Sequence, residues 1–393
     1  MINDRDNELL IVISLEESEV LDLAMLRSFK LKNFRCFNNL TLEPLERVNL
    51  IAGKNNVGKT SLLEAIFIFI NPTKPDSLLQ INRLRGITRT VQFEDIEEIR
   101  GFFYSQDLEE AIELSSVEED SVQRSLKIYL DKSEKFQKEQ MRQLPLSLLS
   151  ANDLDDSMSE IYESLTTEVK AYDTLVLEYY DANKTKHLSR ISFTADGRLI
   201  GRSRRERFPL GIYLTSSIRS SREDTERFSN LERVGRQDEL LESLRLLEPR
   251  LQRLTLLVVE REPIIYGDIG MNQLVPLPLM GEGIGRLLSI LLAISNAKGG
   301  TVLIDEIENG LHYSVLTGVW RAIADAARRA DTQVIATTHS QECIIAAHKA
   351  FEKSEKYDFR YHRLERARSE ILQALTYDRE TLATSDEMNL EMR

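Results

Sequence analysis

The chain has 393 residues, with 51 Lys or Arg against 64 Asp or Glu, so its net charge is −13. This length suits one large α/β core with an insertion. The negative net charge excludes a protein that coats nucleic acid through its overall charge, but it is compatible with a local basic patch. Two cysteines exclude a disulfide framework and favour the cytoplasm. No apolar run reaches the roughly 18 residues of a transmembrane helix and the acidic N-terminus is unlike a signal peptide, so no membrane partner is expected.

The first expected elements follow an acidic extension, residues 1–24, and Met25 is an alternative start. Residues 26–37 alternate imperfectly between apolar and basic side chains, which predicts an edge strand and its turn. The apolar run at 48–52 predicts a buried strand, and residues 61–70 predict a buried helix after a glycine-rich turn.

The middle of the chain differs in composition. Segment 107–120 has seven acidic residues and no basic one, so residues 101–170 are predicted to be a helical, solvent-facing insertion. Strands are expected at 175–180 and 188–193. Segment 184–207 carries eight basic residues against two acidic ones, which makes it the basic part of an acidic chain.

Helices and strands alternate again in the last third. A helix is expected at 284–296, a strand at 301–305, a helix at 315–330 and a strand at 333–340. This order predicts an α/β fold with a mainly parallel sheet covered by helices. The predicted division is an extension (1–24), the first half of the α/β core (25–100), an insertion (101–207) and the second half of the core (208–393).

The strongest motif is a phosphate-binding loop between a predicted strand and a predicted helix. It matches G-x-x-x-x-G-K-[ST]. Its glycines let successive backbone N–H groups face phosphates, and the helix adds its positive N-terminal dipole. Lys59 reaches the β- and γ-phosphates, and Thr60 offers its hydroxyl to Mg²⁺. The predicted ATP contacts here are Gly53, Lys54, Asn55, Asn56, Val57, Gly58, Lys59, Thr60 and Ser61.

Two carboxylates and a histidine follow later predicted strands. Asp305 ends the strand at 301–305, where α/β sheets place ligands, and is expected to hold Mg²⁺. Glu306 is expected to orient or deprotonate the attacking water. His339 follows the next strand and is expected to contact the γ-phosphate. The turn before the apolar helix, Gly281, Glu282 and Gly283, is a second candidate anion site.

These ordered segments resemble the ABC-type ATPases of the SMC, RecF and OLD lineage, in particular small bacterial AAA-type ATPases. The resemblance covers residues 25–393 apart from the insertion. It is carried by LRSFKLKNFRCF, IAGKNNVGKTSLLEAI, MGEGIGRLLSILLAI, TVLIDEIENGLHYS and ATTHSQECI. It implies a P-loop NTPase fold, the ABC ATPase head, with a helical and β insertion.

The resemblance also implies roles. The loop at 53–60 would be the Walker A motif, Asp305 the Walker B metal ligand and Glu306 the catalytic glutamate. His339 would be the switch histidine, and Gly281–Gly285 the signature loop that caps the γ-phosphate of the opposite subunit. Two chains would then sandwich two ATP molecules, as a homodimer or a higher homo-oligomer. Residues 308–312 would form the D-loop, and Gln92 is the candidate Q-loop glutamine.

Some features of the family are changed or missing. Gly281 replaces the usual signature serine and Glu282 a glycine, and His312 replaces a D-loop aspartate. We expect neither the long coiled coil of SMC proteins, because only about 200 residues separate the two groups of motifs, nor the nuclease domain of full-length OLD proteins. A transporter motor is disfavoured by the signature loop, and a GTPase by the lack of an N-K-x-D motif.

The resulting hypothesis is an Mg²⁺-dependent ATPase that dimerises around ATP and controls a DNA-linked process, either repair or defence against phage. The basic segment, Lys184–Arg207, is the candidate DNA contact, although it also suits a solvated hairpin or an acidic partner. The alternative is an ATP-gated sensor or scaffold that holds or releases a separately encoded effector, such as a nuclease.

Overall fold

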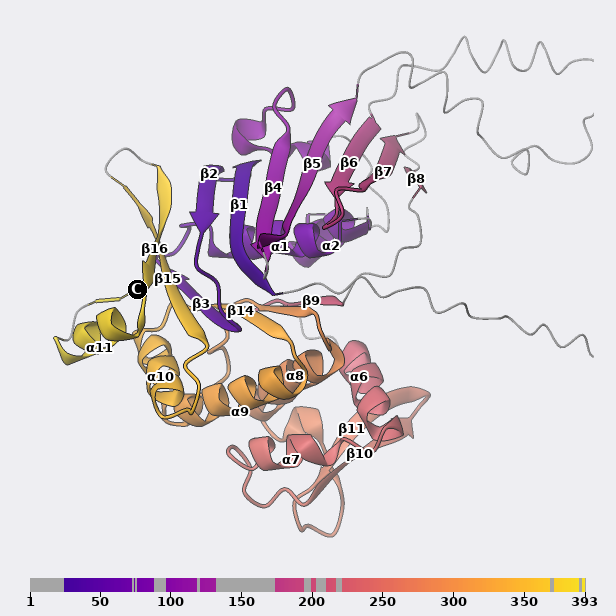
Figure 1. Cartoon of the computed structure of the whole chain (residues 1–393). Coiled ribbons are helices and arrows are strands. Elements are labelled where there is room, and N and C mark those ends of the chain that lie inside the picture. The colour runs from indigo at the N-terminus through magenta and orange to yellow at the C-terminus, as the bar shows by residue number, and fades with distance from the viewer. Residues whose placement is uncertain are drawn as a thin grey trace, which may run out of the picture.

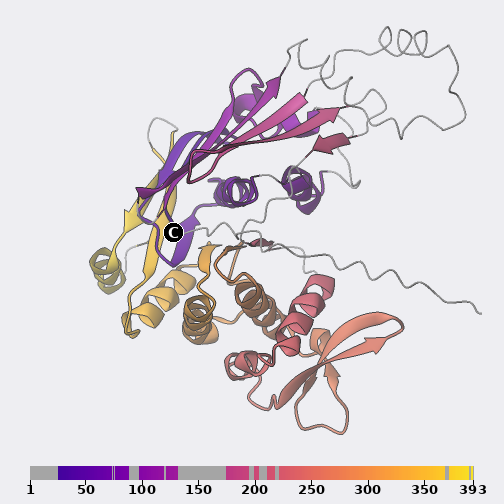
Figure 2. The same cartoon turned by 45° about the vertical axis from the view of Figure 1, so that its right-hand side comes forward.

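The structure is a computed structural model, and the described part of the chain is residues 25–72, 74, 76–87, 97–118, 121–131, 174–193, 199–202, 210–216, 221–367, 371–388 and 391–392. The expected extension 1–24 and Gln92 lie outside these residues. In Figures 1 and 2, helices α1 and α2 lie between two large sheets, and α8, α9 and α10 cover the far face of the lower sheet. Their bounds are α1 (Lys59–Ile70), α2 (Asp76–Leu84), α8 (Glu282–Asn296), α9 (Leu316–Arg329) and α10 (Gln341–Glu352).

The lower sheet has six strands in the order β16-β15-β3-β14-β13-β9. All neighbouring pairs are parallel except β15 with β16. This arrangement confirms the predicted α/β fold with a mainly parallel sheet. The strands are β3 (Val48–Gly53), β9 (Gly211–Leu214), β13 (Thr301–Ile304), β14 (Gln333–Thr337), β15 (Phe359–Arg366) and β16 (Leu372–Tyr377).

The central strands of this sheet are apolar on both faces. Leu50 of β3 belongs to a core cluster shared with α8, α9 and α10, whereas its neighbour Ile51 belongs to a cluster shared with α1. Val302 and Leu303 of β13 divide in the same way. Because successive side chains of a strand point to opposite faces, a continuous apolar run is what a sheet covered on both sides requires.

The upper sheet is antiparallel and has seven strands in the order β2-β1-β4-β5-β6-β7-β8. One face packs over α1, where the ring of Phe69 contacts those of Phe29 (5.5 Å between centroids) and Tyr179 (6.5 Å). The strands are β1 (Leu26–Phe34), β2 (Phe37–Leu42), β4 (Ile112–Glu118), β5 (Gln123–Asp131), β6 (Thr174–Tyr180), β7 (Lys186–Phe193) and β8 (Leu199–Arg202).

Two predictions about this sheet are wrong. Strand β1 lies between β2 and β4, so it is an interior strand and not an edge. The described part of the predicted helical insertion contains strands β4 and β5. Although β4 is acidic, buried Ile112 and Leu114 alternate with exposed Glu113, which is the period of a half-buried strand. Residues 132–170 lie outside the described part, and the division of the chain at 101 and 207 stays a prediction.

The remaining elements lie around these layers. Strands β10 and β11 form a small sheet with β12 beside α6 and α7 (Figure 1). In the described residues, no helix is both long and apolar enough to cross a membrane. The bounds are α3 (Glu97–Arg100), α6 (Ser221–Arg233), α7 (Asp238–Leu244), β10 (Arg253–Val259), β11 (Glu262–Asp268), β12 (Val275–Pro276), α11 (Arg379–Glu387) and the 3-10 helices Tyr104–Gln106, Leu277–Leu279 and Tyr313–Val315.

Candidate active site

The predicted phosphate loop connects β3 to α1, and both of its motif glycines are required by geometry. Gly53 ends β3 with a φ of +150°, and a Cβ there would lie 2.6 Å from the carbonyl oxygen of Leu364. Gly58 precedes α1 with a φ of +96°, and its Cβ would lie 2.6 Å from the ring of Phe37. Any larger residue would have to move neighbouring backbone or aromatic atoms. Glycine at both positions therefore allows the backbone to curve, so that its N–H groups can face a ligand.

Lys59 begins α1 and folds back over the loop. Its Nζ donates hydrogen bonds to the carbonyl oxygens of Gly53 (2.7 Å) and Lys54 (3.1 Å), and the residue is buried. Burial lowers the pKa of Lys59, and the nearby carboxylates, Asp305 first, oppose that shift. The ammonium group is therefore held inside the curve of the loop, where a phosphate would displace its carbonyl partners.

Asp305 connects the loop to the ends of two strands. It follows β13 and is buried, and its Oδ2 accepts a hydrogen bond of 2.9 Å from Oγ1 of Thr60. Its Oδ1 accepts a bond of 2.6 Å from Oγ1 of Thr337, the last residue of β14. Three elements, α1, β13 and β14, thus place a carboxylate and a hydroxyl side by side. This pair of hard oxygen ligands fits Mg²⁺, which takes one or two protein oxygens beside substrate phosphates and water.

Glu306 lies next to this pair in a strained backbone conformation, with a φ of +47°. Its N–H donates to Oγ1 of Thr337 (2.9 Å), and its Oε2 accepts from Nδ2 of Asn309 (2.9 Å). Its Oε1 lies 3.8 Å from Nδ1 of His339. The side chains of Glu306 and His339 are 37% and 49% exposed, so both remain accessible to a ligand.

Several residues of this arrangement have no role in the prediction from sequence. Thr337 links Asp305 to Glu306, and Arg286 of α8 donates hydrogen bonds to the carbonyl oxygens of Asp305 (2.7 Å) and Thr215 (2.9 Å). Arg286 is buried, although it lies in an apolar helix. A charged residue in such a helix is the sequence feature that points to a buried partner. Asn309 has no comparable sequence feature.

The predicted signature turn lies at the start of α8. Gly281 has a φ of +108° and is exposed, as is Glu282. A Cβ on Gly283 would lie 2.6 Å from the carbonyl oxygen of Gly310, so the turn packs against the segment that follows Glu306. Among the described residues, no hydrogen bond joins this turn to the phosphate loop of the same chain. The structure therefore brings together the predicted residues at 53–61, 305–306 and 339, whereas the signature turn contacts the segment after Glu306 without a hydrogen bond to the phosphate loop.

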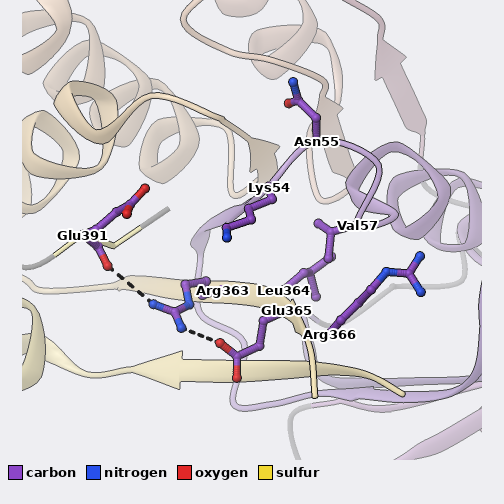
Figure 3. Close-up of a pocket in the computed structure, with 8 residues that line it drawn as sticks. All are labelled: Lys54, Asn55, Val57, Arg363, Leu364, Glu365, Arg366 and Glu391. Carbon is purple, nitrogen blue, oxygen red and sulfur yellow. Dashed lines mark hydrogen bonds and ion pairs between the residues drawn. The ribbon is translucent and has the colours of Figure 1, made fainter. Parts of the chain in front are cut away.

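A cavity of about 450 Å³ borders the phosphate loop on the side of β15. Because β3 lies between β15 and β14, this side is opposite to Asp305. Figure 3 shows Arg363 between Glu365 and the backbone carbonyl of Glu391. The cavity shares loop residues with the candidate active site. It is lined by Lys54, Asn55, Val57, Arg363, Leu364, Glu365, Arg366 and Glu391.

The predicted basic segment is only partly described, because residues 194–198 and 203–209 lie outside. Lys184 is exposed in a turn. Nζ of Lys186 lies 2.9 Å from Oε2 of Glu178, so its charge is already paired. In the described part of the segment, the charge of Lys186 is thus compensated by Glu178, whereas Lys184 is exposed.

Comparisons with known proteins identify relatives. Residues 48–344 match the family model "AAA domain, putative AbiEii toxin, Type IV TA system". An "ATP/GTP phosphatase" of Helicobacter pylori is 24% identical over 346 residues, which span 81% of this chain and 86% of that protein. The "DNA replication and repair protein RecF" of Pseudoalteromonas translucida is 57% identical over 42 residues, 11% of this chain and 12% of that protein. A solved SMC head bound to the C-terminal winged-helix domain of ScpA aligns over 93% of this chain and 99% of that chain, at 12% identity and a TM-score of 0.47.

The family match covers most of the chain, including the phosphate loop, both carboxylates and His339. The resemblance to the SMC and RecF lineage is confirmed, and so is the prediction of ATPase activity. The chain belongs to the "AAA domain, putative AbiEii toxin, Type IV TA system" family and is an ATPase of the SMC- and RecF-like lineage.

Proposed function

We propose that the protein hydrolyses MgATP at the site formed by the loop at 53–61, Asp305, Glu306 and His339, within a dimer that closes around two nucleotides. The observation that carries this proposal is the network in which Asp305 accepts from Thr60 (2.9 Å) and from Thr337 (2.6 Å). It joins the phosphate loop to the strand ends that bear the catalytic groups, so one ligand would contact all of them.

Each group has a chemical task in this proposal. The loop N–H groups and the N-terminus of α1 bind the β-phosphate, and Lys59 moves from its carbonyl partners to the β- and γ-phosphates. Thr60 Oγ1 and Asp305 Oδ2 would hold Mg²⁺, which neutralises the charge that develops on the phosphates. Glu306 orients the attacking water and accepts its proton, and His339 contacts the γ-phosphate.

Two variants test the catalytic assignment. Lys59→Ala should abolish hydrolysis and weaken nucleotide binding, because it removes the cation that neutralises the phosphates. Glu306→Gln should retain ATP binding and stop turnover, because an amide does not accept the proton of water. Hydrolysis is measured as phosphate release, and binding is measured with radiolabelled ATP. A Glu306→Gln protein that hydrolyses ATP at the wild-type rate would refute the role of this residue.

The dimer is proposed from the exposure of the signature turn. Gly281 and Glu282 are exposed at the N-terminus of α8, where backbone N–H groups suit an anion. Two exposed apolar side chains flank it: Leu279, two residues before Gly281, is 76% exposed, and Tyr313, three residues after the Gly310 that packs against Gly283, is 66% exposed. Such groups are candidates for burial against a second copy. In that copy the turn would face the γ-phosphate of the first.

We propose a DNA-linked process as the output, with Lys184–Arg207 as the contact. Binding to phosphates through Lys and Arg releases counterions and weakens steeply as salt rises. A titration of a labelled DNA duplex at increasing salt tests this contact. Loss of binding by one or more decades supports it, and binding that ignores salt, or no binding in low salt, contradicts it.

A specific observation favours the alternative, an ATP-gated scaffold for a separately encoded effector. On the open face of the upper sheet, cross-strand neighbours alternate in charge, in the order Lys32, Glu113, Lys127 and Glu178. Opposite charges paired across strands suit a protein surface better than a DNA backbone, because the lysines are already compensated. Expression of the Glu306→Gln protein from its native locus tests this idea. A second protein that co-purifies and is released when ATP is added supports the scaffold, and a chain that purifies alone contradicts it.

A further inference from the structure

Glu308 lies two residues after Glu306, in the turn that follows β13, and contacts His339, which follows the neighbouring strand β14. Its Oε1 accepts a hydrogen bond from the backbone N–H of His339 (2.9 Å) and lies 3.1 Å from Nδ1 of the same residue. One carboxylate oxygen thus accepts from the backbone of the histidine and lies next to its ring nitrogen. Glu308 is mostly buried, with a side-chain exposure of 10%, whereas the ring that it holds is 49% exposed.

Burial of the second oxygen of Glu308 costs free energy of folding. Its Oε2 is buried and has no hydrogen-bond partner within the described ranges. Buried carboxylate oxygens are normally hydrogen-bonded, so an unpaired one needs an explanation beyond folding. A carboxylate that served only to stabilise the turn would be expected to have donors for both oxygens.

We propose that Glu308 is the positioning residue of His339. A carboxylate oxygen 3.1 Å from Nδ1 favours the tautomer with its hydrogen on Nδ1 and limits the rotation of the ring. The other ring nitrogen, Nε2, has no hydrogen-bond partner among the residues that the structure describes and is available to a ligand. This inference rests on the proposed function, in which His339 contacts the γ-phosphate.

The surrounding contacts distinguish Glu308 from Glu306 as the residue that holds the ring. Oε1 of Glu306 lies 3.8 Å from Nδ1, which is too long for a hydrogen bond, and its Oε2 is bonded to Asn309. The turn that follows β13 therefore holds two reacting groups separately, Glu306 through Asn309 and His339 through Glu308. Gly310, the residue after Asn309, packs against Gly283 of the signature turn. The turn after β13 therefore also contacts the surface that is proposed to meet the partner copy.

A double-mutant cycle on the full chain tests the proposal. Steady-state ATPase rates are measured for Glu308→Met, which fills the same space without an acceptor, for His339→Ala and for the double variant. If Glu308 acts through the ring, Glu308→Met should lower kcat by roughly 10- to 100-fold with little change in KM. The same substitution in the His339→Ala background should then change kcat by less than about twofold. Glu308→Gln keeps an oxygen acceptor at the same reach and should recover most of the activity.

The control is Glu352→Ala, which removes an exposed carboxylate from the end of α10 and should leave the rate unchanged. A wild-type kcat in Glu308→Met, or a further large loss in the double variant, overturns the proposal. A wild-type kcat in His339→Ala instead removes the role of His339 from the proposed function.

Where these rates are too low to compare, ¹⁵N NMR of the imidazoles shows which ring nitrogen of His339 carries the hydrogen. The signals of His339, identified by their loss in His339→Ala, should show hydrogen on Nδ1 in the wild type and a shift toward hydrogen on Nε2 in Glu308→Met. Unchanged signals in Glu308→Met overturn the proposal.

Discussion

Replacement of Thr337 by Val tests the link between Asp305, the proposed metal ligand, and Glu306, the proposed catalytic glutamate. The side chain is fully buried, and valine has nearly the same shape, so the change removes two hydrogen bonds and little else. Oγ1 of Thr337 donates to Asp305 at 2.6 Å and accepts from the N–H of Glu306 at 2.9 Å. A hydrogen bond to a charged group contributes about 1.5–3 kcal/mol. At about 1.4 kcal/mol per factor of ten, we expect kcat to fall roughly 10- to 150-fold.

Thr332, the residue before the first residue of the same strand, provides the matched control. It is equally buried, and its Oγ1 donates to the carbonyl oxygens of Ile294 (3.1 Å) and Ala297 (2.9 Å). Thr332→Val should lower the free energy of unfolding by about 1–3 kcal/mol and leave kcat unchanged. Steady-state ATPase assays and urea denaturation measure the two quantities. Equal losses of kcat in the two variants, or a wild-type rate in Thr337→Val, would refute the reasoning.

Three further variants probe other parts of the account. Gly58→Ala places a Cβ against the ring of Phe37 and should weaken ATP binding by at least roughly tenfold, whereas Gly101→Ala, which has open space around it, should not; isothermal titration compares them. Arg286→Met leaves buried carbonyl oxygens near Asp305 without a donor and should lower the free energy of unfolding by about 2–4 kcal/mol, measured by urea denaturation. Burial lowers the pKa of His362 to about 3, so the unfolded chain takes up the proton first and stability is lost as pH falls from about 6.5 toward 3. At pH 4.5, His362→Gln should remove up to about 2.7 kcal/mol of this loss in the free energy of unfolding. Urea denaturation of the wild type and the variant at a series of pH values measures the difference.

The phosphate loop and the strand ends were predictable because their information is local. A buried strand, a loop with glycines at fixed spacing and a helix occur in sequence at 48–70, and each part has its own pattern. Asp305 and His339 each follow an apolar run, and the carboxyl ends of parallel strands meet at one edge. Their convergence therefore follows from the class of fold.

Contacts that depend on turn conformation were not predictable. The roles of Thr337 and Glu308 follow from the positive φ of Glu306, which directs the chain after β13 toward the end of β14. The pattern of acidic residues does not encode that angle. The acidic composition of β4 obscures the alternation that marks it as a strand, and its pairing with β1 joins residues 81 to 92 positions apart. The pairing of Lys186 with Glu178 likewise becomes visible only when β6 and β7 are placed together.

The central claim is that two chains close around ATP, and the molar mass of the Glu306→Gln protein tests it most directly. Light scattering after gel filtration gives the mass with ATP and Mg²⁺, with ADP and without nucleotide. ATP should double the mass of the nucleotide-free form and ADP should not, and adding Lys59→Ala should prevent the change. A mass of Glu306→Gln that does not respond to ATP, although ATP is bound, would contradict the account.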